Sequence, residues 1–231
     1  MDFNRIHFDS VDSTSSYARR NASLLKTPCI ITASHQTSGR GRQGKSFFSP
    51  EGTGLYMTLL LQAEPESALI TPAAAVAVCK AIEALTEIKP SIKWVNDIFV
   101  NGKKVCGILS ECFCENGRTY ISVGVGINLT TSEFPSELNQ AASLGVECSK
   151  DELSQLICNG IIEYINNPDD EYILGEYRKR LFIIGKKITY EKNGNAFEAT
   201  VCDINEKCNL IVQTDSLNTD ILSSGEISIK V

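Results

Sequence analysis

The chain has 231 residues, of which 42% are hydrophobic, so it can bury a sizeable core as one large domain or as a large and a small one. Its formal net charge of −6 argues against a general nucleic-acid binder. It has neither a signal-peptide core nor the ~20 consecutive apolar residues of a membrane helix. We therefore expect a cytoplasmic protein that binds neither nucleic acid nor membranes. Nine scattered cysteines without a C-x-x-C pair, beside only two histidines, predict reduced thiols and leave little room for a zinc site or a Ser/His/Asp triad.

The first 62 residues predict two strands, a helix and a third strand around a glycine-rich loop. A short strand is expected over 3–8, and the polar run 9–15 supplies capping residues for a helix that continues to about Lys26. Residues 29–34 and 55–62 are typical of buried strands on either side of the loop. The loop therefore lies at strand ends.

The loop at residues 36–50 is typical of an anion site. It alternates glycines with cations: Gly39, Arg40, Gly41, Arg42, Gly44 and Lys45. Glycines let backbone N–H groups turn toward an anion, and the cations add full charges. The stretch also matches the phosphate-loop and dinucleotide-loop patterns, but Pro50 follows where both need a helix. A small-anion site is the favoured interpretation, and a solvated, flexible loop is the alternative.

The middle of the chain predicts a helix followed by an antiparallel meander. Thr71 and Pro72 are suitable as the cap and first residue of an Ala-rich helix over 73–87. Two Asn-Gly pairs then separate β-rich runs, which is a strong hairpin signal. The expected strands cover 91–95, 98–100, 103–114 and 118–128.

The rest of the chain predicts two helices and then a change of character. The polar stretch 130–149 has no clear pattern, and helices are expected over 151–166 and 169–182. From about residue 183 short strands with turns indicate a small all-β domain, over 187–191, 196–204, 209–214 and 226–231. Since helices and strands do not alternate regularly, the fold class is α+β, with domains 1–182 and 183–231.

Three further stretches have the residue types of a ligand site. Residues 93–97 (Lys-Trp-Val-Asn-Asp) place a carboxylate, an amide and an indole at a strand end, and 103–104 place two lysines before a strand. In 123–128, glycines two apart leave one strand face open, where a ligand could lie flat. Taken singly, these are equally typical of turn residues, solvated charge, a core tryptophan and a bulge.

Taken together and in order, six stretches resemble the biotin protein ligases. They are residues 12–14, 39–44, 93–97, 104–109, 124–128 and 224–228. The resemblance implies a mixed-sheet catalytic domain of the class II aminoacyl-tRNA synthetase/biotin ligase type and a C-terminal SH3-like β-barrel. It also implies a single-function enzyme without the DNA-binding domain that some members carry at the N-terminus. Its substrates would be ATP, with Mg²⁺, and biotin, and its partner a biotin carboxyl carrier protein.

The resemblance also implies roles for individual residues. Those expected around biotin are Ser13, Thr14, Ser15, Gln36, Arg40, Gly41, Arg42, Tyr56, Thr58, Lys104, Gly107, Gly124 and Gly126. Those expected on the nucleotide side are Gly39, Arg42, Lys45, Phe47, Trp94, Asn96, Asp97 and Asn128. The catalytic residues would be Arg42, Lys104 and Asp97, while the ligands of Mg²⁺ stay open.

This chemistry suits the residue types. Biotin's carboxylate must attack the α-phosphorus of ATP, and Arg42, Lys104 and Mg²⁺ can stabilise the growing negative charge. A carrier lysine then attacks biotinyl-AMP, and Asp97 can orient or deprotonate it. Four positions depart from the common family pattern: Ser15, Phe47, Val95 and Cys106.

Two alternatives and the oligomeric state remain open. A lipoyl or octanoyl transferase could use Cys106 as a nucleophile, and a non-catalytic module could bind biotin without reaction. A homodimer is one candidate assembly.

Overall fold

A computed structural model describes residues 3–63, 69–192, 194–214, 218–223 and 227–229. The helices are α1 (Thr14–Asn21), α2 (Ile70–Leu85), α3 (Lys150–Asn166) and α4 (Asp170–Arg180). The first strands are β1 (Asn4–Val11), β2 (Cys29–Gln36), β3 (Gly54–Gln62), β4 (Ser91–Lys93), β5 (Asp97–Val100), β6 (Lys103–Glu115) and β7 (Arg118–Asn128). The last are β8 (Lys187–Lys192), β9 (Asn195–Ile204), β10 (Leu210–Gln213), β11 (Thr219–Leu222) and β12 (Ile227–Ile229).

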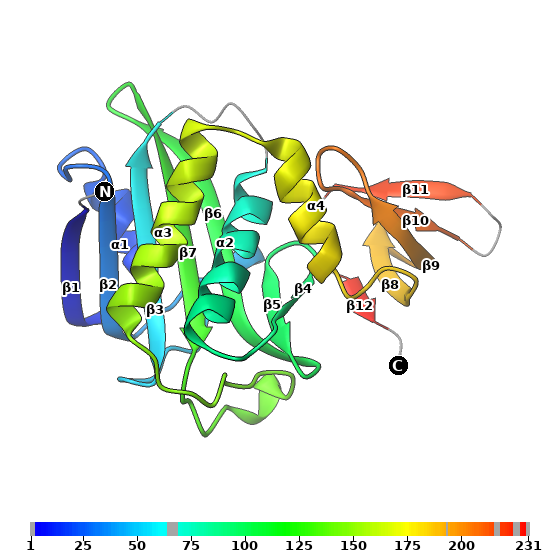
Figure 1. The fold of residues 1–231 in the computed structure, drawn as a ribbon, viewed down its shortest axis with the longest axis horizontal. Coiled ribbons are helices and arrows are strands. Elements are labelled where there is room, and N and C mark those ends of the chain that lie inside the picture. Colours follow the sequence, from blue (N-terminus) through cyan, green and yellow to red (C-terminus); the bar gives the residue numbers. More distant parts are fainter. Residues whose placement is uncertain (1–2, 64–68, 193, 215–217, 224–226, 230–231) are drawn as a thin grey trace.

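The strands form two sheets, which lie side by side in Figure 1. The larger has seven strands in the order β1-β2-β3-β7-β6-β5-β4. Only its β1–β2 pair is parallel, so the sheet is mixed, and the predicted meander is confirmed by antiparallel pairing from β4 through β7. The register places Gly126 opposite both Tyr56 and Gly107, and Gly124 opposite Thr58. The three glycines, from β6 and β7, are therefore neighbours of Tyr56 and Thr58 of β3.

Helices cover the two faces of this sheet unequally. The main core packs α2, α3 and the buried side of the sheet together, while a smaller cluster packs α1 against the opposite face (Figure 1). Because side chains alternate along a strand, Cys106 and Ile108 of β6 join the main core, and Gly107 between them faces the α1 side. The open face beside α1 is where a ligand can reach the glycines.

Two helix predictions need correction. Helix α1 ends at Asn21, not near Lys26, because the Asn21 carbonyl accepts the N–H groups of Leu24 and Leu25 as the chain turns away. Helix α2 begins at Ile70 with Leu69 as its N-cap, so Pro72 lies inside the first turn, where its missing N–H has no partner to lose. Of the helices in the described ranges, none has the length and apolar character needed to cross a bilayer.

The small β domain predicted after residue 183 is confirmed as a five-stranded antiparallel sheet of order β11-β10-β9-β8-β12. Strand β11 was not predicted, because its four residues include Asp220 and offer little alternation. Two predictions lie partly outside the described residues. Asn193 belongs to a turn between the predicted strands, and residues 224–226 belong to the stretch 224–228 that resembles the family.

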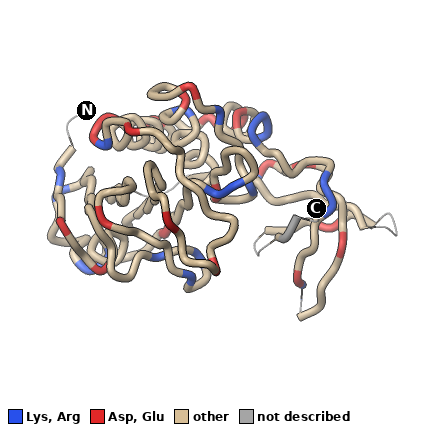
Figure 2. Tube along the Cα trace, turned by 90° about the horizontal axis from the view of Figure 1, so that it is seen from below, with Lys and Arg blue, Asp and Glu red and all other residues tan. Residues whose placement is uncertain are grey.

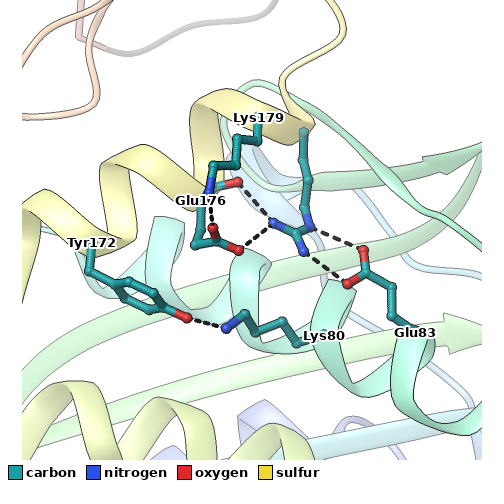
Figure 3. Close-up of polar contacts among 6 residues, drawn as sticks. Lys80, Glu83, Tyr172, Glu176 and Lys179 are labelled. Atoms are coloured by element: carbon teal, nitrogen blue, oxygen red, sulfur yellow. Dashed lines mark hydrogen bonds and ion pairs between the residues drawn. The ribbon is translucent and has the colours of Figure 1, made fainter.

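Charged residues of both signs are interspersed along the chain (Figure 2), and one ionic cluster fastens α4 to α2. The Arg180 guanidinium lies 2.8 Å from Glu83 Oε2 on α2 and 2.9 Å from Glu176 Oε2 on its own helix. Lys179 also contacts Glu176, at 2.6 Å, and Lys80 donates to the Tyr172 hydroxyl (Figure 3). The Lys179 ammonium and the Arg180 guanidinium lower the pKa of Glu176 to about 2.

This cluster predicts a pH-dependent stability. Because the pKa of Glu176 is lowered from 4.5 to about 2 on folding, its charged form stabilises the fold above pH 4.5, and this stability is lost as the pH falls toward 2. Glu176→Gln should lower the free energy of unfolding by about 1–2 kcal/mol at pH 7, and the deficit should shrink at pH 3. Urea unfolding at both pH values measures it. An equal deficit at both would contradict an ionic origin.

Candidate active site

A cavity of about 430 Å³ opens on the α1 side of the large sheet. It is lined by most of the predicted site residues, which come from the start of α1, the glycine loop, strands β2 and β5 to β7, and the turn between β4 and β5. These are Ser13, Thr14, Ser15, Gln36, Arg40, Gly41, Arg42, Lys45, Phe47, Trp94, Asn96, Asp97, Lys104, Gly107, Gly124 and Gly126. Stretches far apart in the sequence therefore form one site.

The end of the cavity beside α1 is lined by buried hydroxyl and amide groups. Ser13 caps α1, and Thr14 and Ser15 follow in its first turn, exposed by only 2% and 5%. Gln36 Oε1 accepts hydrogen bonds from Thr14 N at 2.9 Å and Thr14 Oγ1 at 3.2 Å. Beneath them Thr58 Oγ1 donates to Thr14 Oγ1 at 2.8 Å and lies 3.0 Å from Ser15 Oγ. This end can both donate and accept hydrogen bonds, and it carries no full charge.

The other end holds a chain of charged and amide groups. Lys104 Nζ lies 2.7 Å from Asp97 Oδ1, which also accepts from Asn96 Nδ2 at 3.2 Å. Asn96 Nδ2 donates to Ile108 O at 2.9 Å as well, and Arg42 donates to Asn96 Oδ1 at 3.0 Å. Asp97 begins β5 and pairs with Gly107 of β6, which brings it close to Lys104. Two cations thus flank one carboxylate, partly open to solvent, where an anion could replace their present partners.

The glycine loop closes over the sheet as a small hairpin. Gly41 N donates to Lys45 O at 2.7 Å, and Phe47 N donates to Gly39 O at 2.8 Å. A Cβ at position 39 would lie 2.4 Å from Phe47 O, which only glycine avoids. Arg40 forms a two-point ion pair with Glu111 of β6, with both N···O distances at 3.0 Å. The loop is therefore anchored to the strand that carries Lys104 and Gly107.

The predicted glycine slot exists, but the Phe47 ring covers it. A Cβ at Gly126 would lie 2.4 Å from this ring, and one at Gly107 would lie 3.3 Å from it. A Cβ at Gly124 would instead lie 2.5 Å from Ser15 Oγ. Since no atom fits between Gly126 and Phe47, the ring must move before a ligand can lie on the glycines.

Four predicted residues do not line the cavity. Thr58 reaches it only through Thr14 and Ser15, as described above. Tyr56 lies beside Phe47, with ring centroids 6.4 Å apart, and its hydroxyl donates to Pro50 O. Asn128 Nδ2 donates to Ala142 O at 3.0 Å, so Asn128 holds a neighbouring segment, and Gly39 shapes the loop. These positions support the wall from behind.

Sequence reasoning missed a second wall, formed by residues 137–141. This segment runs parallel to the start of β6: Lys104 N donates to Gln140 O, and Ala142 N donates to Lys104 O, both at 2.8 Å. It lies in the polar stretch 130–149, for which no helix or strand was predicted, because the apolar residues there follow neither the helix period nor the strand period. Other unpredicted lining residues are Gln43, Ser46, Met57, Lys93, Ile108, Leu109, Val125 and, from the C-terminal sheet, Ile227.

Cys106 is placed away from the cavity. Its side chain is 1% exposed in the main core, and burial raises the pKa of its thiol well above the ordinary value. A nucleophilic cysteine needs an accessible thiolate, so this environment does not suit one. Among the described residues, no three carboxylate, histidine or cysteine side chains form a cluster that could hold a metal ion.

Comparisons with known proteins agree with this geometry. Residues 7–128 match the model of the biotin/lipoate A/B protein ligase family, and residues 183–230 match that of the biotin protein ligase C terminal domain. The bifunctional ligase/repressor BirA of Bacillus subtilis is 34% identical over 167 residues, covering 69% of this chain and 50% of the relative. The biotin--[acetyl-CoA-carboxylase] ligase of Mycobacterium tuberculosis is 26% identical over 216 residues, covering 86% and 77%.

A solved structure gives the same result at the level of the fold. Biotin protein ligase from Aquifex aeolicus, in complex with biotin and ATP, superposes with a TM-score of 0.82 at 27% identity and covers 98% of both chains. This chain spans about half the length of the Bacillus relatives, so their whole activity is not carried over here. The family model nevertheless matches more than half of the residues, including every strand of the large sheet except the first part of β1. The chain therefore belongs to the biotin/lipoate A/B protein ligase family.

Proposed function

We propose that the chain is a biotin protein ligase, which uses ATP to convert biotin to biotinyl-5'-AMP and then transfers biotin to a lysine of a carrier protein. The proposal includes a catalytic domain of residues 1–182 and a C-terminal domain of residues 183–231. The name of the Mycobacterium relative, a biotin--[acetyl-CoA-carboxylase] ligase, supports the carrier of that carboxylase as acceptor. The biotin and ATP in the Aquifex complex support the two small substrates.

The observation that carries the choice of biotin is the polar, uncharged end of the cavity. The ureido ring of biotin has two N–H donors and a carbonyl acceptor, which match the hydroxyls of Ser13, Thr14 and Ser15 and the amide of Gln36. The dithiolane of lipoate and the alkyl end of octanoate offer no such partners. Either would displace solvent from these groups without using their remaining hydrogen-bonding capacity, whereas biotin would use it.

In the first step the carboxylate of biotin attacks the α-phosphorus of ATP, and pyrophosphate leaves. Arg42 and Lys104 lie where they can turn from Asn96 and Asp97 toward the reacting anions and stabilise the negative charge that grows in the transition state. Mg²⁺ bound with ATP would neutralise further phosphate charge, and the oxygens of Asn96 and Asp97 are of the ligand type that it prefers. No protein nucleophile is required.

In the second step the carrier lysine attacks the acyl carbon of biotinyl-AMP, an amide bond forms and AMP leaves. The amine must lose a proton before or during the attack. Asp97, at the mouth of the charged end, can accept that proton or orient the amine. The exposed fraction of its side chain, 23%, allows a macromolecular substrate to approach.

A substrate assay tests the proposal against both alternatives. Purified protein should release pyrophosphate with ATP and biotin, but not with lipoate or octanoate. A non-catalytic module predicts biotin binding without release, and a lipoyl or octanoyl transferase predicts the reverse preference. Either of those results would refute the proposed activity.

Cys106→Ala should leave biotin transfer within about threefold of wild type, because the thiol lies in the core and no enzyme thioester forms. Mass spectrometry of the native protein after turnover should find no acyl-cysteine. Exposed Cys202 gives the matched control, since Cys202→Ala removes a thiol that reagents can reach. A dead but folded Cys106→Ala variant would support the transferase instead.

A further inference from the structure

The loop that carries Asn96 and Asp97 is held from outside the catalytic sheet. The indole N–H of Trp94 donates to the Cys208 carbonyl at 2.7 Å, which reaches into the turn between β9 and β10. The Tyr177 hydroxyl of α4 donates to the Val95 carbonyl at 3.1 Å. The Trp94 bond is buried and the Tyr177 bond is partly buried, and the two side chains are 6% and 0% exposed. Trp94 and Val95, which immediately precede Asn96 and Asp97, are therefore both held by hydrogen bonds.

The turn that presents the Cys208 carbonyl is tightly made. Asn205 Oδ1 accepts from Lys207 N at 3.0 Å and Asn209 N at 2.9 Å, and Cys208 N donates to Asn205 O. Cys208 itself has a φ of 58°, a left-handed conformation that residues other than glycine rarely adopt. Strained backbone conformations are often found at functional sites, and Cys208 contacts the loop that carries Asn96 and Asp97.

Further contacts join these parts into one block. Cys208 and Tyr177 are both buried in the main core cluster, so the C-terminal sheet and α4 meet beside the site loop. Arg178, the next residue of α4, donates to Asp203 Oδ1 at 2.9 Å and to Ile204 O at 2.8 Å. Helix α4 and the end of β9 are therefore bonded to each other. Residues 94–95 bond to both parts: Trp94 to the turn that follows β9, and Val95 to α4.

We propose that Tyr177 and the 205–209 turn are positioning elements for Asn96 and Asp97. They would fix the loop so that Asn96 faces Arg42 and Asp97 faces Lys104. Neither Tyr177 nor the turn lines the cavity, so they act through Trp94 and Val95 rather than on substrate. This assignment rests on the proposed function, and it gives the 205–209 turn of the C-terminal sheet a part in the chemical step.

Two variants separate positioning from simple structural support. Tyr177→Phe removes one hydroxyl, and Asn205→Ala removes the acceptor that closes the turn, while Asn205→Asp keeps an acceptor and should behave as wild type. Tyr164→Phe is the matched control, because Tyr164 is also a buried tyrosine but bonds Asp170, away from the site. We expect the kcat for pyrophosphate release to fall about tenfold in the first two variants, the effect of one lost hydrogen bond on the geometry of the charged end. The Kd for biotin, measured by calorimetry, should stay within about twofold, because the hydroxyl end is untouched.

Trp94 adds a readout that does not depend on activity, because it is the only tryptophan in the chain. Its fluorescence should shift to the red in Tyr177→Phe and Asn205→Ala as the indole loses its fixed contact, and not in Tyr164→Phe. Unchanged kcat and unchanged emission in both variants would overturn the proposal, as would equal losses of kcat and biotin affinity. If Tyr177→Phe does not fold, partly exposed Asn205 decides the question alone. Wild-type protein that releases no pyrophosphate would refute the proposed function, while the emission shifts would still test the junction.

Discussion

Lys104→Ala should slow pyrophosphate release with biotin and ATP by about 100-fold or more, or roughly 2.7 kcal/mol in activation free energy. The Lys104 ammonium lies 2.7 Å from Asp97 and beside Gly107, so its removal has two consequences. The growing negative charge loses a cation, and the Asp97 carboxylate is left to repel the carboxylate of biotin. Arg42→Ala should cause a similar loss, because it removes the cation on the other side of Asn96.

The neighbouring lysine provides the control. Lys103 has the same charge but does not line the cavity, and its ammonium is held by the carbonyl of the wall residue Asn139, so Lys103→Ala should change the rate less than about threefold. Stopped-flow pyrophosphate detection at saturating ATP measures both variants. Asp97→Asn, with Lys104 kept, should affect transfer to the carrier more than pyrophosphate release. Equal rates for Lys104→Ala and wild type would remove Lys104 from the chemistry.

Local signals in the sequence were sufficient for the meander and for the strands of the C-terminal sheet other than β11. The Asn-Gly pairs at 101–102 and 116–117 form tight turns in which both residues have positive φ, a requirement that few other residues meet. The glycines at 124 and 126 are two apart, so they share a strand face whatever the register. Antiparallel pairing with β6 then brings Gly107 beside Gly126. The role of residues that determine the backbone conformation can thus be predicted from their type and spacing in the sequence.

Contacts between distant segments were not readable in this way. The wall at 137–141 depends on backbone bonds to Lys104, and backbone bonds leave no trace in residue type. Nothing in the sequence shows that the Phe47 ring would lie on Gly126. The bond from Trp94 to Cys208 spans 114 residues and ends on a carbonyl that every residue has. Such contacts can be identified only from the three-dimensional structure.

Gly126→Ala should weaken biotin binding by about 30-fold to 100-fold without unfolding the protein. Gly126 lies in the middle of the slot, and a methyl group there projects into the space over which a ligand must lie. Overpacking of this kind costs about 1–3 kcal/mol, and in the complex the methyl group would occupy space that the ligand needs. Isothermal titration with biotin measures the loss. Gly175→Ala adds the same methyl group to α4, where no atom lies within 4 Å, and should bind biotin as wild type does.

The Phe47 ring makes a second variant necessary, because a Cβ at position 126 would lie 2.4 Å from it even without ligand. Combining Gly126→Ala with Phe47→Ala removes that clash and leaves the methyl group facing only the ligand. If the slot holds biotin, the double variant should bind it far more weakly than Phe47→Ala alone. If the two bind equally, the loss in Gly126→Ala came from displacing the ring, and the glycine is required for packing Phe47 rather than for the substrate.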